Sequence, residues 1–200
     1  IQHHAEMAIA SAEAGVRGIF MEKPFVQSVT QADAVVAACE ASNTKLNLAL
    51  VNRYCPTMAT ISELIADGKL GTLLEVRARG KEDIRGGGQD LWVLGPHVLD
   101  LMVHFGGAPQ WCNATVTTNG KPVTSDDFFA GTEGIPMIAG DSITAAFGLA
   151  DGPTGFFAST REAGLKQPNL ASPYSGRRAK YTSARTIFHK HTSAQPLLGG

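Results

Sequence analysis

The chain has 200 residues, of which 44% are hydrophobic and 18% are charged, and this composition is typical of a globular protein rather than a disordered one. No run approaches the roughly 18 to 20 apolar residues that a membrane span needs, so we expect no membrane partner. The formal net charge is -1, and three widely spaced cysteines fit no metal-ligand pattern, which favours buried thiols in a reducing, cytoplasmic environment.

The chain opens with a helical pattern followed by a strand pattern. Alanines and Ile9 recur at helical spacing in residues 5–14, and Gly15 stands where a glycine stop is typical. An apolar run follows at residues 17–25. Pro24 cuts this run, because proline cannot donate to a sheet ladder. The pattern therefore predicts a strand whose carboxyl end carries Glu22 and Lys23.

The same alternation is then repeated. Thr30 and Asp33 form a plausible capping pair for a second helix, and residues 46–51 predict a strand buried on both faces. Helix, strand, helix, strand is the rhythm of a parallel sheet. A doubly wound domain needs more strands than these, so residues 1–54 are expected to be the C-terminal remnant of a Rossmann-type sheet.

A different pattern begins after residue 54. Residues 56–68 predict a helix closed by a glycine, and residues 74–79 alternate apolar and charged side chains, as an antiparallel strand does. Residues 95–105 predict an amphipathic helix with proline in its first turn. Further strands are predicted at 111–118, 142–149 and 154–160. Residues 55–163 are thus expected to form an α+β domain, with helices on an open antiparallel sheet.

The final 37 residues differ in charge from the rest. Residues 1–165 hold all 18 acidic residues and 11 Lys and Arg, whereas the remainder holds six Lys and Arg and no acid. A basic tail suits a nucleic-acid arm. Its prolines and lack of apolar periodicity favour instead a poorly ordered, atypical tail at 164–200, so no nucleic-acid partner is expected.

One motif at a strand end could carry chemistry. The sequence contains no G-x-G-x-x-G turn, and Gly86-Gly87-Gly88 follows a polar loop, so these 200 residues should bind a dinucleotide weakly if at all. Glu22-Lys23-Pro24 ends a strand, where ligands of open α/β sheets bind. A lysine there could polarise a substrate hydroxyl, although a short E-K-P motif is more often a solvated strand end.

A larger set of residues in chain order adds weight to this motif. The matching positions are His3 to Gly15, Glu22-Lys23-Pro24, Asn52-Arg53-Tyr54 with Pro56, Leu64-Ile65 with Gly68 to Gly71, and Gly87-Gly88 leading to His97, Asp100 and Phe105-Gly106. Together they resemble the glucose-fructose oxidoreductase and inositol dehydrogenase family, Gfo/Idh/MocA. The resemblance covers roughly residues 1–163.

This resemblance implies a Rossmann domain that binds NAD or NADP, and hydride exchange at a sugar, cyclitol or similar small molecule. It also implies a homo-oligomer formed through the open sheet. Because the glycine turn is missing, the chain is expected to be an N-terminally truncated fragment that is inactive alone.

The resemblance also implies roles for individual residues. Lys23 and His97 match the family's catalytic lysine and histidine, while Glu22 and Arg53, with Lys23, are expected to edge the cofactor cleft. The family often places Asp four residues before that histidine, but this chain has Val93. A missing carboxylate removes a partner that would orient the histidine.

Other interpretations stay open. Asp90 is a candidate to replace the missing carboxylate, and His97 could simply cap a helix. The stripe of His97, Asp100 and His104 invites a metal site. Its histidines, however, lie about 10 Å apart along a helix, too far for one zinc ion, so no metal is expected. A second hypothesis is a non-catalytic module for dimerisation or ligand sensing.

Overall fold

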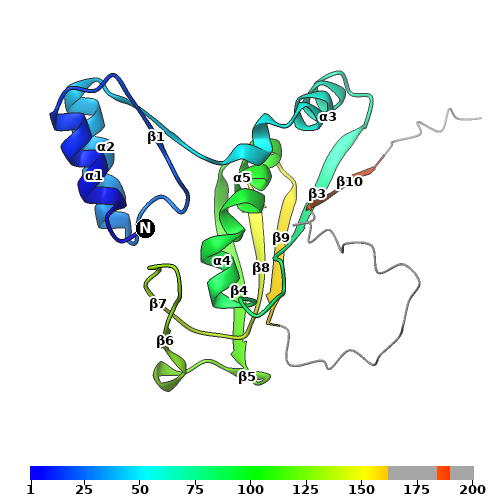
Figure 1. Ribbon diagram of the computed structural model, residues 1–200. Coiled ribbons are helices and arrows are strands. Elements are labelled where there is room, and N and C mark those ends of the chain that lie inside the picture. Colours follow the sequence, from blue (N-terminus) through cyan, green and yellow to red (C-terminus); the bar gives the residue numbers. More distant parts are fainter. Residues whose placement is uncertain (162–183, 190–200) are drawn as a thin grey trace, which may run out of the picture.

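The computed structural model describes residues 1–161 and 184–189. Its first part contains four elements: α1 (His4–Glu13), β1 (Gly18–Met21), α2 (Val29–Ser42) and β2 (Lys45–Leu48). The two strands pair in parallel, and α1 lies beside α2 (Figure 1). This arrangement confirms the predicted helix, strand, helix, strand order of a Rossmann-type sheet. The cap of α2 differs, because Ser28 rather than Thr30 accepts the hydrogen bond from the Gln31 amide.

The core of this part lies on one side of its two strands. Its buried members are Ala5, Ala8, Ala12, Met21, Val26, Val35 and Cys39. The expectation that residues 46–51 are buried on both faces is wrong. Leu46 and Leu48 are only half-buried, Asn47 is exposed, and Phe20 is 72% exposed, because the described helices cover a single face.

A short turn, η1 (Val51–Tyr54), leads into the second part of the chain. The helices of this second part are α3 (Pro56–Ala66), α4 (Gly88–Val93) and α5 (Gly95–Gly106). The helices predicted at 56–68 and 95–105 are confirmed. The short α4 was not predicted, since six residues are too few to show helical periodicity.

A six-stranded sheet forms the centre of the second part, in the order β10-β3-β9-β8-β4-β5. Its strands are β3 (Thr72–Arg79), β4 (Pro109–Thr118), β5 (Lys121–Pro122), β8 (Ser142–Leu149), β9 (Thr154–Thr160) and β10 (Ala184–His189). β8 and β9 form the predicted hairpin. β3 pairs with β9 in parallel, which corrects the purely antiparallel expectation. Alternation of apolar and polar residues indicates that one face of a strand is exposed to solvent, but it does not indicate whether the neighbouring strand runs parallel or antiparallel.

The tail contributes one strand to this sheet. The sequence predicts no regular element after residue 163, yet β10 pairs with β3 in antiparallel fashion. The stretch contains Thr186, Ile187 and Phe188, residue types that favour strands, and pairing with a sheet edge supplies what their pattern alone lacks. The rest of the predicted tail lies outside the described residues.

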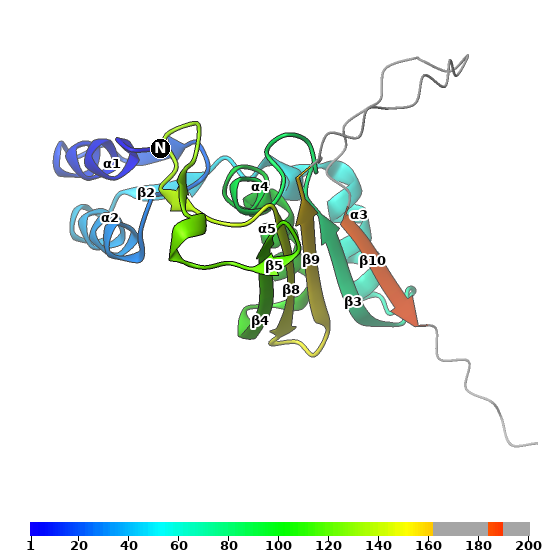
Figure 2. The same ribbon diagram turned by 90° about the horizontal axis from the view of Figure 1, so that it is seen from below.

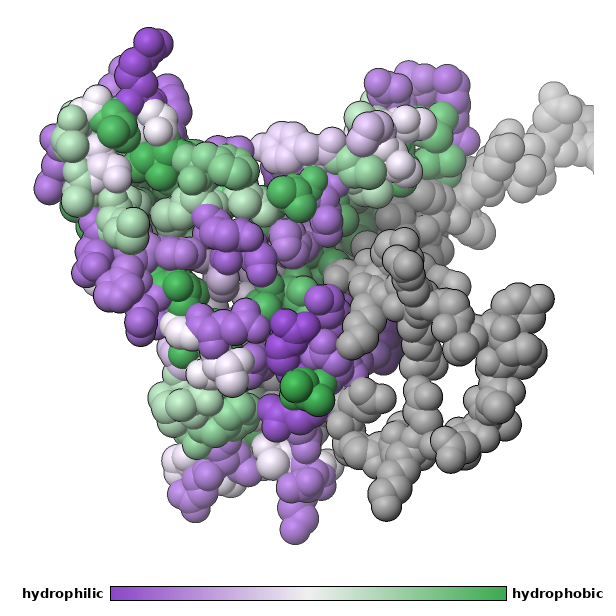
Figure 3. All heavy atoms as spheres, in the orientation of Figure 1, coloured by the Kyte–Doolittle hydropathy of each residue, from purple (hydrophilic) through white to green (hydrophobic). Residues whose placement is uncertain are grey.

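α4 and α5 lie on one side of this sheet (Figure 2). Between α5 and the strands lies a core that includes Val76, Val98, Met102 and Phe157. The opposite face carries the Phe156 ring under the Arg77 guanidinium, and Trp111 packs there directly over Gly148. On the face seen in Figure 3, hydrophilic and hydrophobic residues are interspersed over both parts.

A long excursion joins β5 to β8. It holds η2 (Ser125–Asp127), β6 (Phe129–Ala130) and β7 (Met137–Ile138), and its buried Ile135 and Ile138 pack with Val93 and Leu94 in a third small core. The Gln27 side-chain amide donates to the Gly134 carbonyl at 2.7 Å, so the excursion contacts both parts. Among the described residues no helix combines the length and apolar character that crossing a bilayer requires.

Candidate active site

Lys23 follows β1 at the carboxyl end of the parallel strands. Its ammonium donates a hydrogen bond of 2.8 Å to the Val93 carbonyl at the end of α4. The backbone amide of Lys23 donates to the Glu22 carboxylate at 2.7 Å. The lysine therefore points from the first part toward the second. This contact uses the main chain of Val93, the position where the family resemblance leads one to expect a carboxylate that orients His97.

His97 lies in the first turn of α5, near the same charges. Burial is the main cause that lowers the pKa of His97, and the positive charge of Lys23 adds to this effect. The carboxylates of Glu22 and Asp100 act in the opposite direction. The imidazole is consequently neutral at pH 7. Its Nδ1 is buried and has no hydrogen-bond partner among the described residues, which is uncommon for a buried polar atom.

Arg53 is held by the second part. Its Nε donates to Asp100 Oδ2 at 2.8 Å, and its Nη2 makes a second, shorter contact with Oδ1. This hydrogen bond also raises the pKa of Arg53. The pair joins η1 to α5, so most of the guanidinium is already engaged and contact with a cofactor would have to use its remaining nitrogen.

Asp90 does not replace the missing carboxylate beside His97. Its side chain is fully buried and accepts hydrogen bonds from the Ser159 hydroxyl at 2.6 Å and from the Glu82 amide at 3.3 Å. It thus faces β9 and fixes α4 on the sheet. His104, the last member of the suspected metal stripe, contacts the Ser62 hydroxyl at 3.0 Å.

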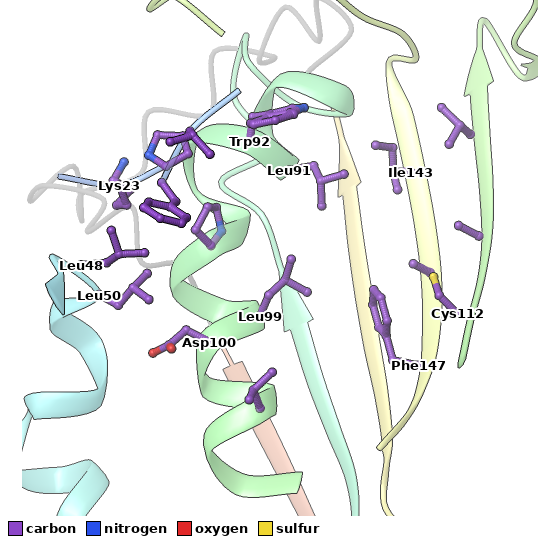
Figure 4. A pocket seen from close by; sticks show the side chains of 18 residues that line it. Lys23, Leu48, Leu50, Leu91, Trp92, Leu99, Asp100, Cys112, Ile143 and Phe147 are labelled. Carbon is purple, nitrogen blue, oxygen red and sulfur yellow. The ribbon is translucent and has the colours of Figure 1, made fainter. Parts of the chain in front are cut away.

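A cavity of about 760 Å³ opens next to Lys23. In Figure 4, Lys23, Leu48 and Leu50 lie on one side of it, and Cys112, Ile143 and Phe147 lie on the opposite side. The sequence pointed to Lys23 and His97 as residues of a shared cavity; Lys23 lines this one, whereas His97 is not among its lining residues. The cavity walls come from β2, α4, α5, β4 and β8, and no local pattern reports that such distant segments meet.

The residues present suit one end of a dinucleotide. The parallel strands direct Lys23 to their carboxyl edge, which is where nucleotide cofactors bind in such sheets, and His97 is near enough for the charge of Lys23 to lower its pKa. These groups fit a nicotinamide ring and a substrate oxygen. The 200 residues contain no glycine turn for the pyrophosphate.

Comparisons with known proteins find relatives among NAD-binding oxidoreductases. Residues 2–50 match the model of an oxidoreductase family with an NAD-binding Rossmann fold, GFO_IDH_MocA. Levoglucosan dehydrogenase of Pseudarthrobacter phenanthrenivorans is 28% identical over 185 residues, which cover 80% of this chain and 47% of that protein. The scyllo-inositol 2-dehydrogenase (NADP(+)) of Bacillus subtilis is 26% identical over 137 residues, or 63% of this chain and 38% of that protein.

Solved structures show the same fold. A levoglucosan dehydrogenase in complex with NADH and levoglucosan has a TM-score of 0.64 at 24% identity, over 82% of this chain and 46% of that one. An NAD binding oxidoreductase from Klebsiella pneumoniae has a TM-score of 0.63 at 19% identity, with the same two coverages. The chain spans less than half the length of these curated relatives and structures.

Proposed function

The chain belongs to the Gfo/Idh/MocA family of oxidoreductases, and from this premise we propose that the complete protein exchanges hydride between NAD or NADP and a hydroxyl-bearing carbon. The substrate is a sugar, a cyclitol or a related small molecule. The single observation that carries the proposal is that Lys23, which lines a cavity, and His97, contributed by different parts of the fold, lie within electrostatic reach of each other.

Lys23 and His97 have different roles in activating the substrate: Lys23 donates a hydrogen bond and His97 accepts a proton. The Lys23 ammonium, steadied by the Val93 carbonyl, donates a hydrogen bond to the substrate oxygen and stabilises negative charge that develops on it. The neutral imidazole of His97 accepts the hydroxyl proton as the C–O bond becomes a carbonyl. The bound NAD(P)+ supplies the acceptor for the hydride that leaves the carbon.

Glu22, Lys23 and Arg53 form the edge of the proposed cofactor cleft. Glu22 and Lys23 follow β1, while Arg53 lies in η1 after β2, so all three sit beyond the carboxyl ends of parallel strands. Their role is to position the nicotinamide end. In the absence of a pyrophosphate loop, we expect the 200-residue chain alone to be inactive.

The two parts of the chain have separate roles in this proposal. Residues 1–54 belong to the dinucleotide-binding domain, and residues 55–163 form the substrate and oligomerisation domain. The sheet face that carries Trp111 is open and rich in small side chains, which suits the pairing of two copies. Sedimentation of the complete protein tests this, and a monomer at micromolar concentration contradicts it. A cytoplasmic location belongs to the same proposal, although the predicted buried thiols are found only at Cys39, because Cys55 and Cys112 are exposed.

Turnover measurements on the complete protein test the catalytic roles. Lys23→Met and His97→Ala are each expected to lower kcat/KM by about 10²- to 10⁴-fold on a sugar or cyclitol substrate. Lys69→Met is the matched control, because Lys69 pairs with Asp67 on an exposed surface. Turnover that neither site change affects would remove the assignment.

Cofactor binding to the isolated chain is a separate test. Titration with NADH, followed by calorimetry, is expected to show no binding at micromolar concentration. Micromolar affinity would mean that the glycine turn is dispensable.

A second candidate function rests on Val93. Since no carboxylate side chain at that position orients His97, a ligand-sensing or dimerisation module of the same fold remains an alternative proposal. Binding of cofactor and sugar by the complete protein without turnover would favour this alternative.

A further inference from the structure

The cavity beside Lys23 extends well beyond the site of the proposed chemistry. It passes along α4 and α5 and reaches the inner face of β4 and β8, where Cys112 and Phe147 lie (Figure 4). Its volume of about 760 Å³ falls within the range of roughly 300–1,000 Å³ that is typical of small-molecule sites. The substrate hydroxyl that would bind near Lys23 needs only a small part of this volume.

Polar groups are scarce in this cavity. Of its lining residues only Lys23 and Asp100 are charged, and Asp100 already accepts two hydrogen bonds from Arg53. Most other walls are aliphatic or aromatic, including Leu50, Leu99 and Phe147. A polyol placed entirely inside would leave most of its hydroxyls without partners, which is unfavourable in a space of this kind.

The arrangement of these groups suits an amphipathic molecule. Lys23 marks one end as the place for an oxygen atom, and the apolar walls continue from there to the sheet. Trp92 adds an aromatic surface near the polar end. A ligand with a hydroxylated ring and an apolar substituent would match both regions, with the substituent against β4 and β8.

We propose that the substrate is a hydroxyl compound that carries an alkyl or aryl substituent, such as a glycoside with an apolar aglycone, and that the substituent binds in this cavity. The inference rests on the proposed function for the oxygen at Lys23. The part of the inference that concerns the apolar substituent depends only on the cavity and its lining residues. A segment of protein is the competing occupant, and the experiment below separates the two.

The two exposed cysteines provide a footprint of occupancy. Cys112 lines the cavity, whereas Cys55 is exposed at the start of α3 and does not line it, and Cys39 is buried. Alkylation of the complete protein by N-ethylmaleimide, followed by peptide mass spectrometry, gives a separate rate for each thiol. The probe is octyl glucoside below its micellar concentration, and free glucose is the comparison.

Octyl glucoside is expected to slow the alkylation of Cys112 by roughly tenfold when present at about ten times its dissociation constant, with no change at Cys55. Glucose is expected to change neither rate. Ala114→Leu, which fills the cavity from β4, should abolish the protection. Ala59→Leu is the matched control, because Ala59 is exposed on α3 and does not line the cavity.

Three results would overturn the proposal. Equal protection by glucose would show that the apolar substituent contributes nothing, and equal slowing of Cys55 would show nonspecific binding. A Cys112 that is unreactive before any ligand is added would show that protein fills the cavity. Because no readout involves cofactor or turnover, failure here is distinguishable from failure of the proposed oxidoreductase function.

Discussion

The ion pair between Arg53 and Asp100 should contribute measurably to stability. The Asp100 side chain is only 8% exposed, so replacing Arg53 by Met would leave a carboxylate in the protein interior without its two charged donors. Breaking buried pairs costs about 3–5 kcal/mol. Arg53 itself is 32% exposed, so water replaces part of the lost interaction and we discount the cost to about 2 kcal/mol.

Urea unfolding of the full chain measures this cost. Arg53→Met, Asp100→Asn and the double variant form a cycle, and we expect a coupling energy of about 1–2 kcal/mol between the two positions. Lys69→Met is the control, since the exposed pair of Lys69 and Asp67 should be worth less than ~0.5 kcal/mol. If Arg53→Met costs no more than this control, the pair does not hold η1 on α5 and the reasoning is refuted.

Three further predictions concern other buried groups. The pKa of His97 is lower in the folded protein than in the unfolded chain, so as the pH falls the unfolded chain binds a proton at His97 first. The neutral His97 therefore stabilises the fold above pH 6.5, and this stabilisation is lost as the pH falls below that value. His97→Gln should reduce the pH dependence of the unfolding free energy between pH 7.5 and 5, and an unchanged slope would contradict the assignment. Phe157→Ala, at a side chain 1% exposed, should cost about 3–5 kcal/mol in urea unfolding, and a loss under ~1 kcal/mol would argue against the described core. Gly80→Ala would place a methyl group 1.7 Å from Asp90 Oδ2, so the melting temperature should fall by several degrees, as a loss of about 1–3 kcal/mol predicts, and an unchanged value would show that the carboxylate lies elsewhere.

The sequence predicted the elements whose patterns are local. The bounds of β8 and β9 agree with the predicted strands, and the helix at 95–105 was found from its apolar spacing and Pro96. It did not predict the parallel pairing of β3 with β9, because an alternating strand looks the same whichever way its neighbour runs. The excursion was missed since its strands have only two residues each.

The candidate site was predicted in part. The end of a strand before Pro24 pointed to Lys23, and the family resemblance added His97, which the structure places near the same charges. The attachment of Arg53 to Asp100 and of Asp90 to Ser159 depends on contacts between residues 47 and 69 positions apart. Spacing along one chain carries no information about such pairs, so these partners required coordinates.

The end of the sheet at β5 has a consequence for the behaviour of the chain in concentrated solution. β5 is only two residues long and pairs with Thr117 and Thr118, so in the described part of the chain most of the outer backbone of β4 has no neighbouring strand. Exposed ladder edges recruit other chains and promote aggregation. Lys121 and Pro122 protect the far tip, because a charge and a missing amide both discourage strand addition, but the longer stretch before them stays open to self-association.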